Sequence, residues 1–199
     1  YTVADGTKII SDAAFADCTN LTRINLPNGI YAIKAYAFDN CTKLSSFVIP
    51  STVQTIGSMA FGRTTALKTI TIPGSVTDFE SAFYSSGLTS VTIENGVKTI
   101  GIKSFENCKS LTSVSIPDSV ETIKSGAFYG CSSLTSLTVP SSVSTIGTGA
   151  FSGCEALTLT VDKDSAAHKY AVSNSIPFVL RGVNPPVQKE IVSISVNST

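Results

Sequence analysis

Apolar and polar residues of this chain alternate in a pattern that returns about every 23 positions. Phenylalanine is its most regular marker, at Phe15, Phe38, Phe61, Phe83, Phe105, Phe128 and Phe151. The steps between these residues are 23, 23, 22, 22, 23 and 23 positions. A fixed period of this length predicts a repeat architecture, because one repeat cannot bury its apolar face without its neighbours.

A clean copy has the skeleton I-x-x-x-A-F-x-x-C-x-x-L-x-x-(I/V/L)-x-(I/V/L)-P, with Val and Ile again after the Pro. In the fifth copy Val114 and Ile116 alternate with Ser113 and Ser115, and a period of two predicts a short strand with one buried face. The following Pro ends the strand because it has no N–H. We therefore expect a parallel sheet of strands at Ile24–Leu26, Phe47–Ile49, Ile70–Ile72, Val91–Ile93, Val114–Ile116, Leu137–Val139 and Leu157–Val161. The Ala-Phe pair belongs to the returning side of each coil.

The third and fourth copies depart from the skeleton. Phe79 stands where Ile is usual and precedes Phe83 by four residues instead of five, and Gly87 falls in the region of the Cys. The third copy has Arg63 and Thr64 where the others have x-Cys. Such departures mark either a site or drift in a tolerant loop, and we favour drift.

The two ends of the chain differ from the repeats. Val3 aligns with Ile49, so the chain starts in mid-repeat, which suggests a trimmed or atypical first coil. Near the other end, residues 165–173 predict a helix with Ser165 as its N-cap. We expect residues 162–181 to cap the solenoid of residues 1–181, because the last coil needs a cover. Residues 182–189 predict a Pro-rich linker, and residues 190–199 alternate like a strand.

Composition narrows the possible partners. Charged residues make up 14% of the chain and the net charge is zero, so there is no basic stripe for nucleic acid. No apolar run approaches the ~18 residues of a membrane span. We expect a monomer that binds no nucleic acid and inserts no segment into a membrane.

The residues that usually carry chemistry have simpler explanations here. The five cysteines share one repeat position, at Cys18, Cys41, Cys108, Cys131 and Cys154. Side chains related by stacking point the same way, so we expect five buried, reduced thiols that stay unreactive until unfolding, and no disulfides. His168 is the only His and falls in the cap. Asp162 and Asp164 could bind calcium, but a turn also favours Asp. No catalytic motif is present, and we expect no enzyme activity, metal or cofactor.

The outward side of the predicted sheet is the candidate partner-binding face. It comprises Arg23, Asn25, Ser46, Val48, Thr69, Thr71, Ser90, Thr92, Ser113, Ser115, Ser136 and Thr138. Binding hot spots favour Trp, Tyr and Arg, whereas this face has one Arg and no aromatic residue, so a plain solvated sheet is the competing interpretation. The loops and returning side offer another surface, with Tyr31, Tyr36, Tyr84, Tyr129 and Arg63.

The strand core, combined with "AF-x-x-C" and "IP-x-S-V", resembles the BspA-type bacterial leucine-rich repeat from about Val3 to Leu180. The resemblance implies an α/β-type leucine-rich-repeat solenoid of about seven coils with a helical cap. It also implies a secreted or surface-anchored protein, often from host-associated bacteria, with a role in adhesion to host or matrix proteins. Residues 190–199 resemble the first strand of a bacterial immunoglobulin-like domain. The expected function is therefore a non-enzymatic binding module for a protein or glycan, and the alternative is a structural spacer that presents other domains.

Overall fold

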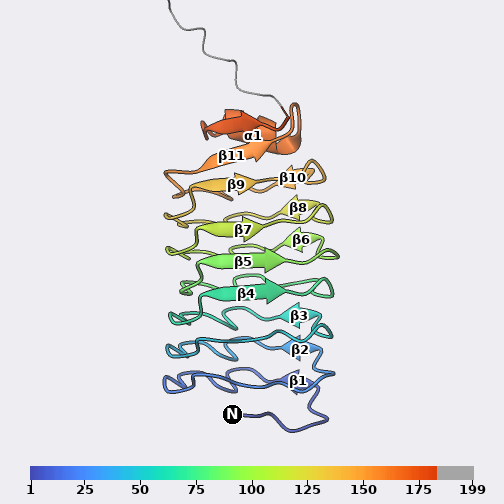
Figure 1. The fold of residues 1–199 in the computed structure, drawn as a ribbon, viewed down its shortest axis with the longest axis vertical. Helices are drawn as coiled ribbons and strands as arrows, with labels where there is room; N and C mark the ends of the chain where they lie inside the picture. Colours follow the sequence, from blue (N-terminus) through green and yellow to red (C-terminus); the bar gives the residue numbers. More distant parts are fainter. Residues whose placement is uncertain (183–199) are drawn as a thin grey trace, which may run out of the picture.

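The structure, a computed structural model, describes residues 1–182 as a stack of coils along one axis (Figure 1). About seven turns of parallel β-solenoid end in one short helix, as the repeat pattern predicts. Each coil contributes a strand on one side, turns, and returns along the opposite side. The coils therefore form two ladders whose strands run in opposite directions in Figure 1.

The first ladder contains the strands that the alternation of Ser or Thr with Val, Ile or Leu predicts. They are β4 (Thr69–Ile72), β5 (Ser90–Ile93), β7 (Ser113–Ser115), β9 (Ser136–Thr138), β11 (Thr158–Val161) and β12 (Phe178–Leu180). They pair in parallel as two sheets, β4-β5-β7 and β9-β11-β12. The register places Thr71, Thr92 and Ser115 side by side, so successive coils align without a shift.

The predicted strands at Ile24–Leu26 and Phe47–Ile49 are wrong as strands. Isolated bridges occur there instead, from Thr2 to Asn25 and from Arg23 to Ser46, so the first of these coils makes two bridges and the second makes one. Phe47 provides a physical reason in the second coil. Its ring lies edge-on to Phe38 and Phe61, with centroids 4.9 and 4.7 Å apart. An aromatic ring needs more room there than the Val, Ile or Leu of later coils, which separates the strand segments.

The second ladder was not predicted from the sequence. It consists of β1 (Ile9–Ile10), β2 (Ala32–Ile33), β3 (Thr55–Ile56), β6 (Thr99–Ile100), β8 (Thr122–Ile123) and β10 (Thr145–Ile146). These strands form the parallel sheets β1-β2-β3 and β6-β8-β10. The shortened fourth coil separates the two sheets, since Asp78 makes only one bridge there, to Thr55. The recurring Thr-Ile pair that ends most repeats is the sequence signal for this ladder.

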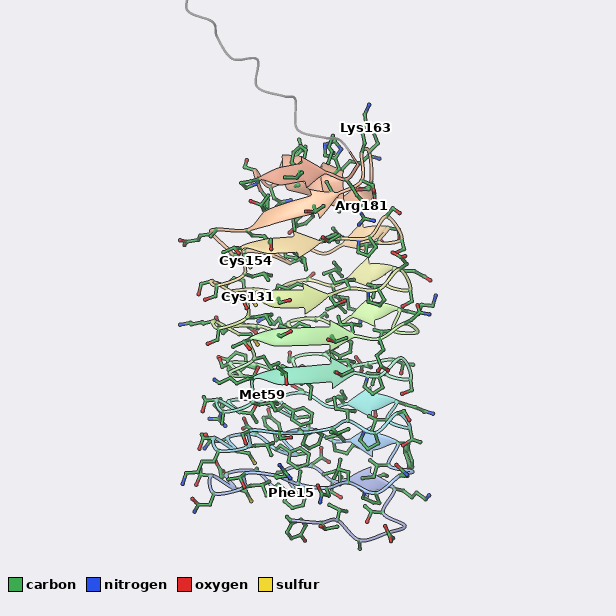
Figure 2. The ribbon with its side chains drawn as sticks, in the orientation of Figure 1. Phe15, Met59, Cys131, Cys154, Lys163 and Arg181 are labelled. Atoms are coloured by element: carbon green, nitrogen blue, oxygen red, sulfur yellow. The ribbon has the colours of Figure 1, made fainter. Side chains whose placement is uncertain are left out.

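The periodic phenylalanines form a continuous stack inside the coils, which begins at Phe15, labelled in Figure 2. Neighbouring rings lie 5.3–5.6 Å apart and within 16° of parallel. The rings are buried except that of Phe15, which is half-buried in the first coil. Phe79 replaces the usual Ile without leaving the core, where it packs edge-on 6.1 Å from Phe105.

The shortened coil corrects one alignment. Ser86, not Gly87, takes the position of the Cys, because its hydroxyl lies 3.3 Å from Cys108 Sγ in the next coil. Gly87 is where a residue is missing. A Cβ on Gly87 would lie 2.0 Å from the backbone oxygen of Thr65, so only glycine allows the two coils to approach this closely.

The structure confirms the helix that the sequence predicts near the end of the solenoid. Helix α1 (Ala166–Ser173) begins after Ser165, whose hydroxyl accepts a hydrogen bond from the His168 backbone N–H at 3.1 Å. The Tyr170 ring packs 5.9 Å from Phe151, the last ring of the stack. After the helix, β12 pairs with β11. The predicted linker, beyond Gly182, and the immunoglobulin-like segment at 190–199 lie outside the described residues.

Candidate functional site

Eight of the twelve predicted outward positions lie in strands of the first ladder, and Arg23, Asn25, Ser46 and Val48 belong to the two coils before it; we call the surface that these twelve residues form the sheet face. Eleven of the twelve side chains are exposed, and that of Ser90 is half-buried. Their alternation with buried residues such as Ile70 and Val91 is the pattern that the sequence predicts. Parallel pairing arranges them in two columns about 4.8 Å apart per step, which produces a regular surface of short side chains.

The sheet face extends further than the sequence prediction. Strand pairing aligns Thr158 with Ser136 and Thr160 with Thr138, so β11 adds two more hydroxyls. Val179 of β12 continues the second column and is 54% exposed. The alternation in Thr158–Val161 was the available signal, because these residues repeat the polar-apolar order of the earlier strands.

Two seams interrupt the face. The first seam lies between Phe47–Ile49 and β4, and the second seam lies between β7 and β9, because no strand pairing joins these neighbours within residues 1–182. Backbone hydrogen bonds show the same interruption. Thr112 N donates to Thr89 O and Thr158 N to Thr135 O, both at 2.9 Å, whereas neither Lys68 N nor Thr135 N makes the equivalent bond.

A pocket opens on the sheet face at each seam. The pocket at the first seam measures about 230 Å³ and is lined by residues that include Val48, Thr71 and Glu94. The pocket at the second seam measures about 400 Å³ and is lined by Thr112, Ser113, Val114, Ser115, Ile116, Ser136, Leu137, Thr138 and Thr160. A third pocket of about 340 Å³ lies beside Arg23, between the first two coils. The sheet face is therefore grooved where coils part.

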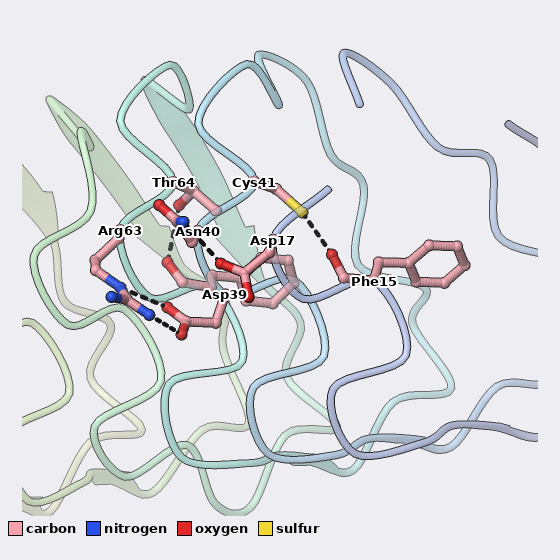
Figure 3. A network of polar contacts seen from close by, with 8 residues as sticks. Phe15, Asp17, Asp39, Asn40, Cys41, Arg63 and Thr64 are labelled. Carbon is pink, nitrogen blue, oxygen red and sulfur yellow. Dashed lines mark hydrogen bonds and ion pairs between the residues drawn. The ribbon is translucent and has the colours of Figure 1, made fainter. Parts of the chain in front are cut away.

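The alternative surface is less continuous. Tyr31, Tyr36 and Tyr129 are 45–46% exposed, whereas Tyr84 is half-buried. Arg63, in the same region, is held by the carboxylate of Asp39, which is 5% exposed (Figure 3). The hydrogen bonds from Arg63 to Asp39 raise the pKa of the guanidinium.

This ion pair has a structural role. Arg63 Nε donates to Asp39 Oδ1 at 3.1 Å, and Arg63 Nη2 donates to Asp39 Oδ2. Gly62 makes room for the contact, because a Cβ there would lie 2.6 Å from Asp39 Oδ1. The departure of the third copy from the repeat pattern thus compensates a buried carboxylate, and the pair occupies two of the five N–H donors of Arg63.

The cysteines line one corner of the stack, and all five are free. Figure 2 shows Cys131 and Cys154 in successive coils on the same side. Four of the five are buried, and their Sγ atoms donate to carbonyl oxygens of the preceding coils, for example Cys108 to Phe83 O at 3.1 Å. Burial raises the pKa of the Cys41 and Cys108 thiols to about 11. A hydrogen bond with Cys154, together with burial, raises the pKa of Cys131.

Cys18 contradicts the expectation that all five thiols are buried. It is exposed, because it lies in the outermost coil, where no preceding turn of the stack covers it. Cys41, one coil further in, is buried and donates to Phe15 O at 3.0 Å (Figure 3). Position in the stack, and not repeat position alone, decides whether a thiol is covered.

The groups considered for metal binding or catalysis serve the cap. His168 accepts a hydrogen bond from the Asp164 backbone N–H at 3.0 Å and packs edge-on to Phe178, 4.7 Å away. Asp162 pairs with Arg181 at 3.6 Å. Within residues 1–182, no three His, Cys, Asp or Glu side chains gather where they could hold a metal ion.

The described part of the chain has no helix with the length and apolar character that crossing a membrane requires.

Comparison with known proteins agrees with the coil geometry. Residues 1–82 and 79–161 match the BspA type leucine-rich repeat region family. A solved leucine-rich repeat protein from Eubacterium ventriosum is 29% identical, with a TM-score of 0.65 over 76% of this chain and 42% of that protein. A leucine-rich cell surface protein from Faecalibacterium prausnitzii is 31% identical, with a TM-score of 0.61 over 81% of this chain and 46% of that protein.

A leucine-rich repeat protein from T. pallidum is 27% identical, with a TM-score of 0.62 over 87% of this chain and 68% of that protein. This chain thus spans less than half the length of the Eubacterium and Faecalibacterium proteins. No curated protein matches it. The family match covers most of the chain in six copies of the repeat. The chain belongs to the BspA-type leucine-rich repeat family.

Proposed function

We propose that this chain is a non-enzymatic binding module of a secreted or cell-surface bacterial protein, and that a protein or glycan partner docks on the sheet face. The observation that carries the proposal is the sheet face itself, with exposed short side chains in two columns over successive coils. Extended faces of repeat solenoids commonly serve as binding surfaces. The Faecalibacterium relative is described as a cell surface protein, which supports an extracellular location.

The chemistry of the face suits polar recognition. Ser and Thr hydroxyls both donate and accept hydrogen bonds, and Arg23 is the one charged residue among the twelve predicted positions. A partner with many hydroxyl or amide groups would find donors and acceptors at regular intervals. The face lacks the aromatic anchors of a tight protein interface, so affinity would come from many weak contacts along the stack.

A spacer role is the second candidate, and a specific observation favours it. Ten of the twelve predicted positions carry neither charge nor an apolar side chain, and none is aromatic. Ser and Thr columns are also good cross-strand neighbours that stabilise a solvated sheet without any partner. In this role the solenoid would present other domains of a longer surface protein.

A binding screen with matched variants separates the two roles. The folded protein is tested against host matrix proteins and a glycan array. The test variant changes Thr71, Thr92 and Ser115 to Lys along the middle of the sheet face. The control changes Gln54, Thr77 and Ser144 to Lys, since these exposed residues flank the second ladder. Binding that the test variant loses and the control keeps supports the module. No binding by the folded wild type favours the spacer.

A further inference from the structure

We propose that the second seam, between β7 and β9, is a binding site for one neutral sugar unit of a glycan. The proposal rests on the proposed binding function and names the ligand class and its place on the sheet face. The seam holds a pocket of about 400 Å³, the largest of the three on this face. That volume falls at the lower end of the range for small-molecule sites, roughly 300–1,000 Å³.

The opening of the seam exposes aliphatic side chains that are buried in neighbouring coils. Val114 and Ile116 are half-buried, whereas Val91 and Ile93 of the preceding strand are 1% and 2% exposed. The pocket therefore has an aliphatic floor as well as a polar rim. Of the inward apolar positions in the coils from β4 to β9, only Val114 and Ile116 are partly exposed, and both border the seam, which argues for a specific opening in the sheet.

The rim consists of hydroxyl side chains from three strands. Ser115 of β7, Thr138 of β9 and Thr160 of β11 follow one column, and Ser113 and Ser136 follow the other. Each hydroxyl can donate or accept a hydrogen bond. Thr135 N, just before β9, also lacks the inter-coil hydrogen bond that Thr112 N and Thr158 N make. The seam thus offers polar groups that the sheet does not use.

The lack of charged residues in the pocket at the second seam favours a neutral ligand. No charged residue lines the pocket, so nothing there would pair with a phosphate, a carboxylate or a metal ion. A neutral sugar presents hydroxyl groups at its edge and C–H groups on its ring faces, which match the rim and the floor. The other two pockets fit less well, because Glu94 lines the one at the first seam and Arg23 lines the third.

The site can be tested by NMR titration of the protein with glucose, galactose, mannose and N-acetylglucosamine, and with their β-linked disaccharides. We expect saturable shifts of the Ser115, Ser136 and Thr138 amides for at least one sugar. Ser115→Ile should weaken that binding tenfold or more, because it fills the pocket with a side chain that strands tolerate. Thr55→Ile is the matched control, because Thr55 is exposed on β3 of the second ladder, outside the sheet face, and this variant should bind as the wild type does.

Each other outcome has a defined meaning. Shifts centred elsewhere, or equal weakening by Ser115→Ile and Thr55→Ile, would overturn the assignment to the second seam. Circular dichroism of both variants shows whether they fold. A wild type that binds no neutral sugar but binds a matrix protein through the sheet face overturns this inference and leaves the proposed function intact. A wild type that binds neither overturns both.

Discussion

At the scale of single residues, the repeat is stable because the phenylalanine and buried cysteine side chains contact the neighbouring coils. Every interior ring of the phenylalanine stack contacts a ring above and a ring below, as Phe83 does with Phe61 and Phe105, both at 5.4 Å. The buried cysteines likewise donate to a carbonyl of a preceding coil. Interior residues therefore stabilise the contact between coils, and a residue at the end of the stack does so on one side only.

Replacement of Phe83 by Ala should lower the free energy of unfolding by about 3–5 kcal/mol, because it leaves a cavity in a fully buried stack. Phe15→Ala should lower it less, since Phe15 is half-buried. Urea unfolding followed by circular dichroism measures both. Equal losses for the two variants would contradict the idea that position in the stack determines the cost.

Thiol labelling should distinguish Cys18 from the other cysteines. We expect one of the five thiols to react rapidly with a maleimide at neutral pH in the native protein, and mass spectrometry should place the label on Cys18, which is exposed. The remaining four should react only when the protein unfolds, because they are buried, and burial also raises the pKa of Cys41 and Cys108. Cys18→Ser should abolish the fast reaction. Fast labelling of Cys131 would contradict the structure.

The raised pKa of Cys108 predicts a loss of stability at alkaline pH. Burial raises this pKa from 9.0 to about 11, so the folded state keeps the proton where the unfolded state releases it. The contribution of this group to stability is complete below pH 9 and is lost as the pH rises towards 11.

Cys108→Ser is the control for this pH dependence, because Ser86 shows that the same corner accepts a hydroxyl. The free energy of unfolding of the wild type should fall more steeply between pH 9 and 11 than that of the variant. Urea titrations at several pH values measure both slopes. Parallel slopes would show that Cys108 titrates in the folded protein as it does in the unfolded chain.

At the scale of the elements, the shortened fourth coil is a structural adaptation. It loses one residue before Phe83, where Glu80 stands in place of two residues, and one at Gly87. Glu80 pairs with Lys124 two coils away, and the intervening Gly101 leaves room for that contact, because a Cβ there would lie 2.9 Å from Glu80 Cγ. The departures of this coil from the repeat pattern thus make contacts that hold coils together.

Gly87→Ala should destabilise the protein by about 3 kcal/mol or more, because its Cβ would collide with the backbone of Thr65, which cannot move aside. Gly149→Ala is the matched control. Its φ is +64° but its Cβ would meet only Ser152 at 3.3 Å, so the expected cost is about 1 kcal/mol. Urea unfolding measures both, and similar costs would show that the close approach at Gly87 relaxes easily.

Some elements of this fold could be predicted from the sequence and others could not. The strands at Ile70–Ile72 and Val91–Ile93 were predictable because alternation of polar and apolar residues reports one buried face. The two-residue strands of the second ladder were missed, since two residues such as Thr122–Ile123 are too few to show a period. The outward direction of the sheet-face residues was predictable for the same reason as the strands. The two seams could not be predicted, because strand pairing depends on how two coils approach each other.

At the scale of the whole molecule, the two seams divide the first ladder into blocks. The sheet β4-β5-β7 lies between the two seams, and the sheet β9-β11-β12 lies beyond the second seam. On this side of the solenoid, the coils before the first seam make only isolated bridges. The second ladder and the phenylalanine stack run past the second seam, through β8 to β10 and Phe105 to Phe128. At the second seam the coils are thus joined through the second ladder and the phenylalanine stack. The pocket at this seam therefore leaves the stack of coils unbroken.

Hydrogen exchange of backbone amides should reveal the seams directly. We expect fast exchange at Lys68 and Thr135, whose N–H groups make no inter-coil hydrogen bond, and slow exchange at Thr112 and Thr158, which occupy the equivalent position and are bonded at 2.9 Å. All four residues lie just before or at the start of a strand and are at least partly exposed, so exposure alone does not separate them. The amides of Phe105 and Phe128 should stay protected on both sides of the second seam, because their bonds to Ala127 O and Ala150 O continue through the stack. Protection of Thr135 equal to that of Thr112 would mean that β7 and β9 close together in solution, and the proposed sugar site would then lose its opening.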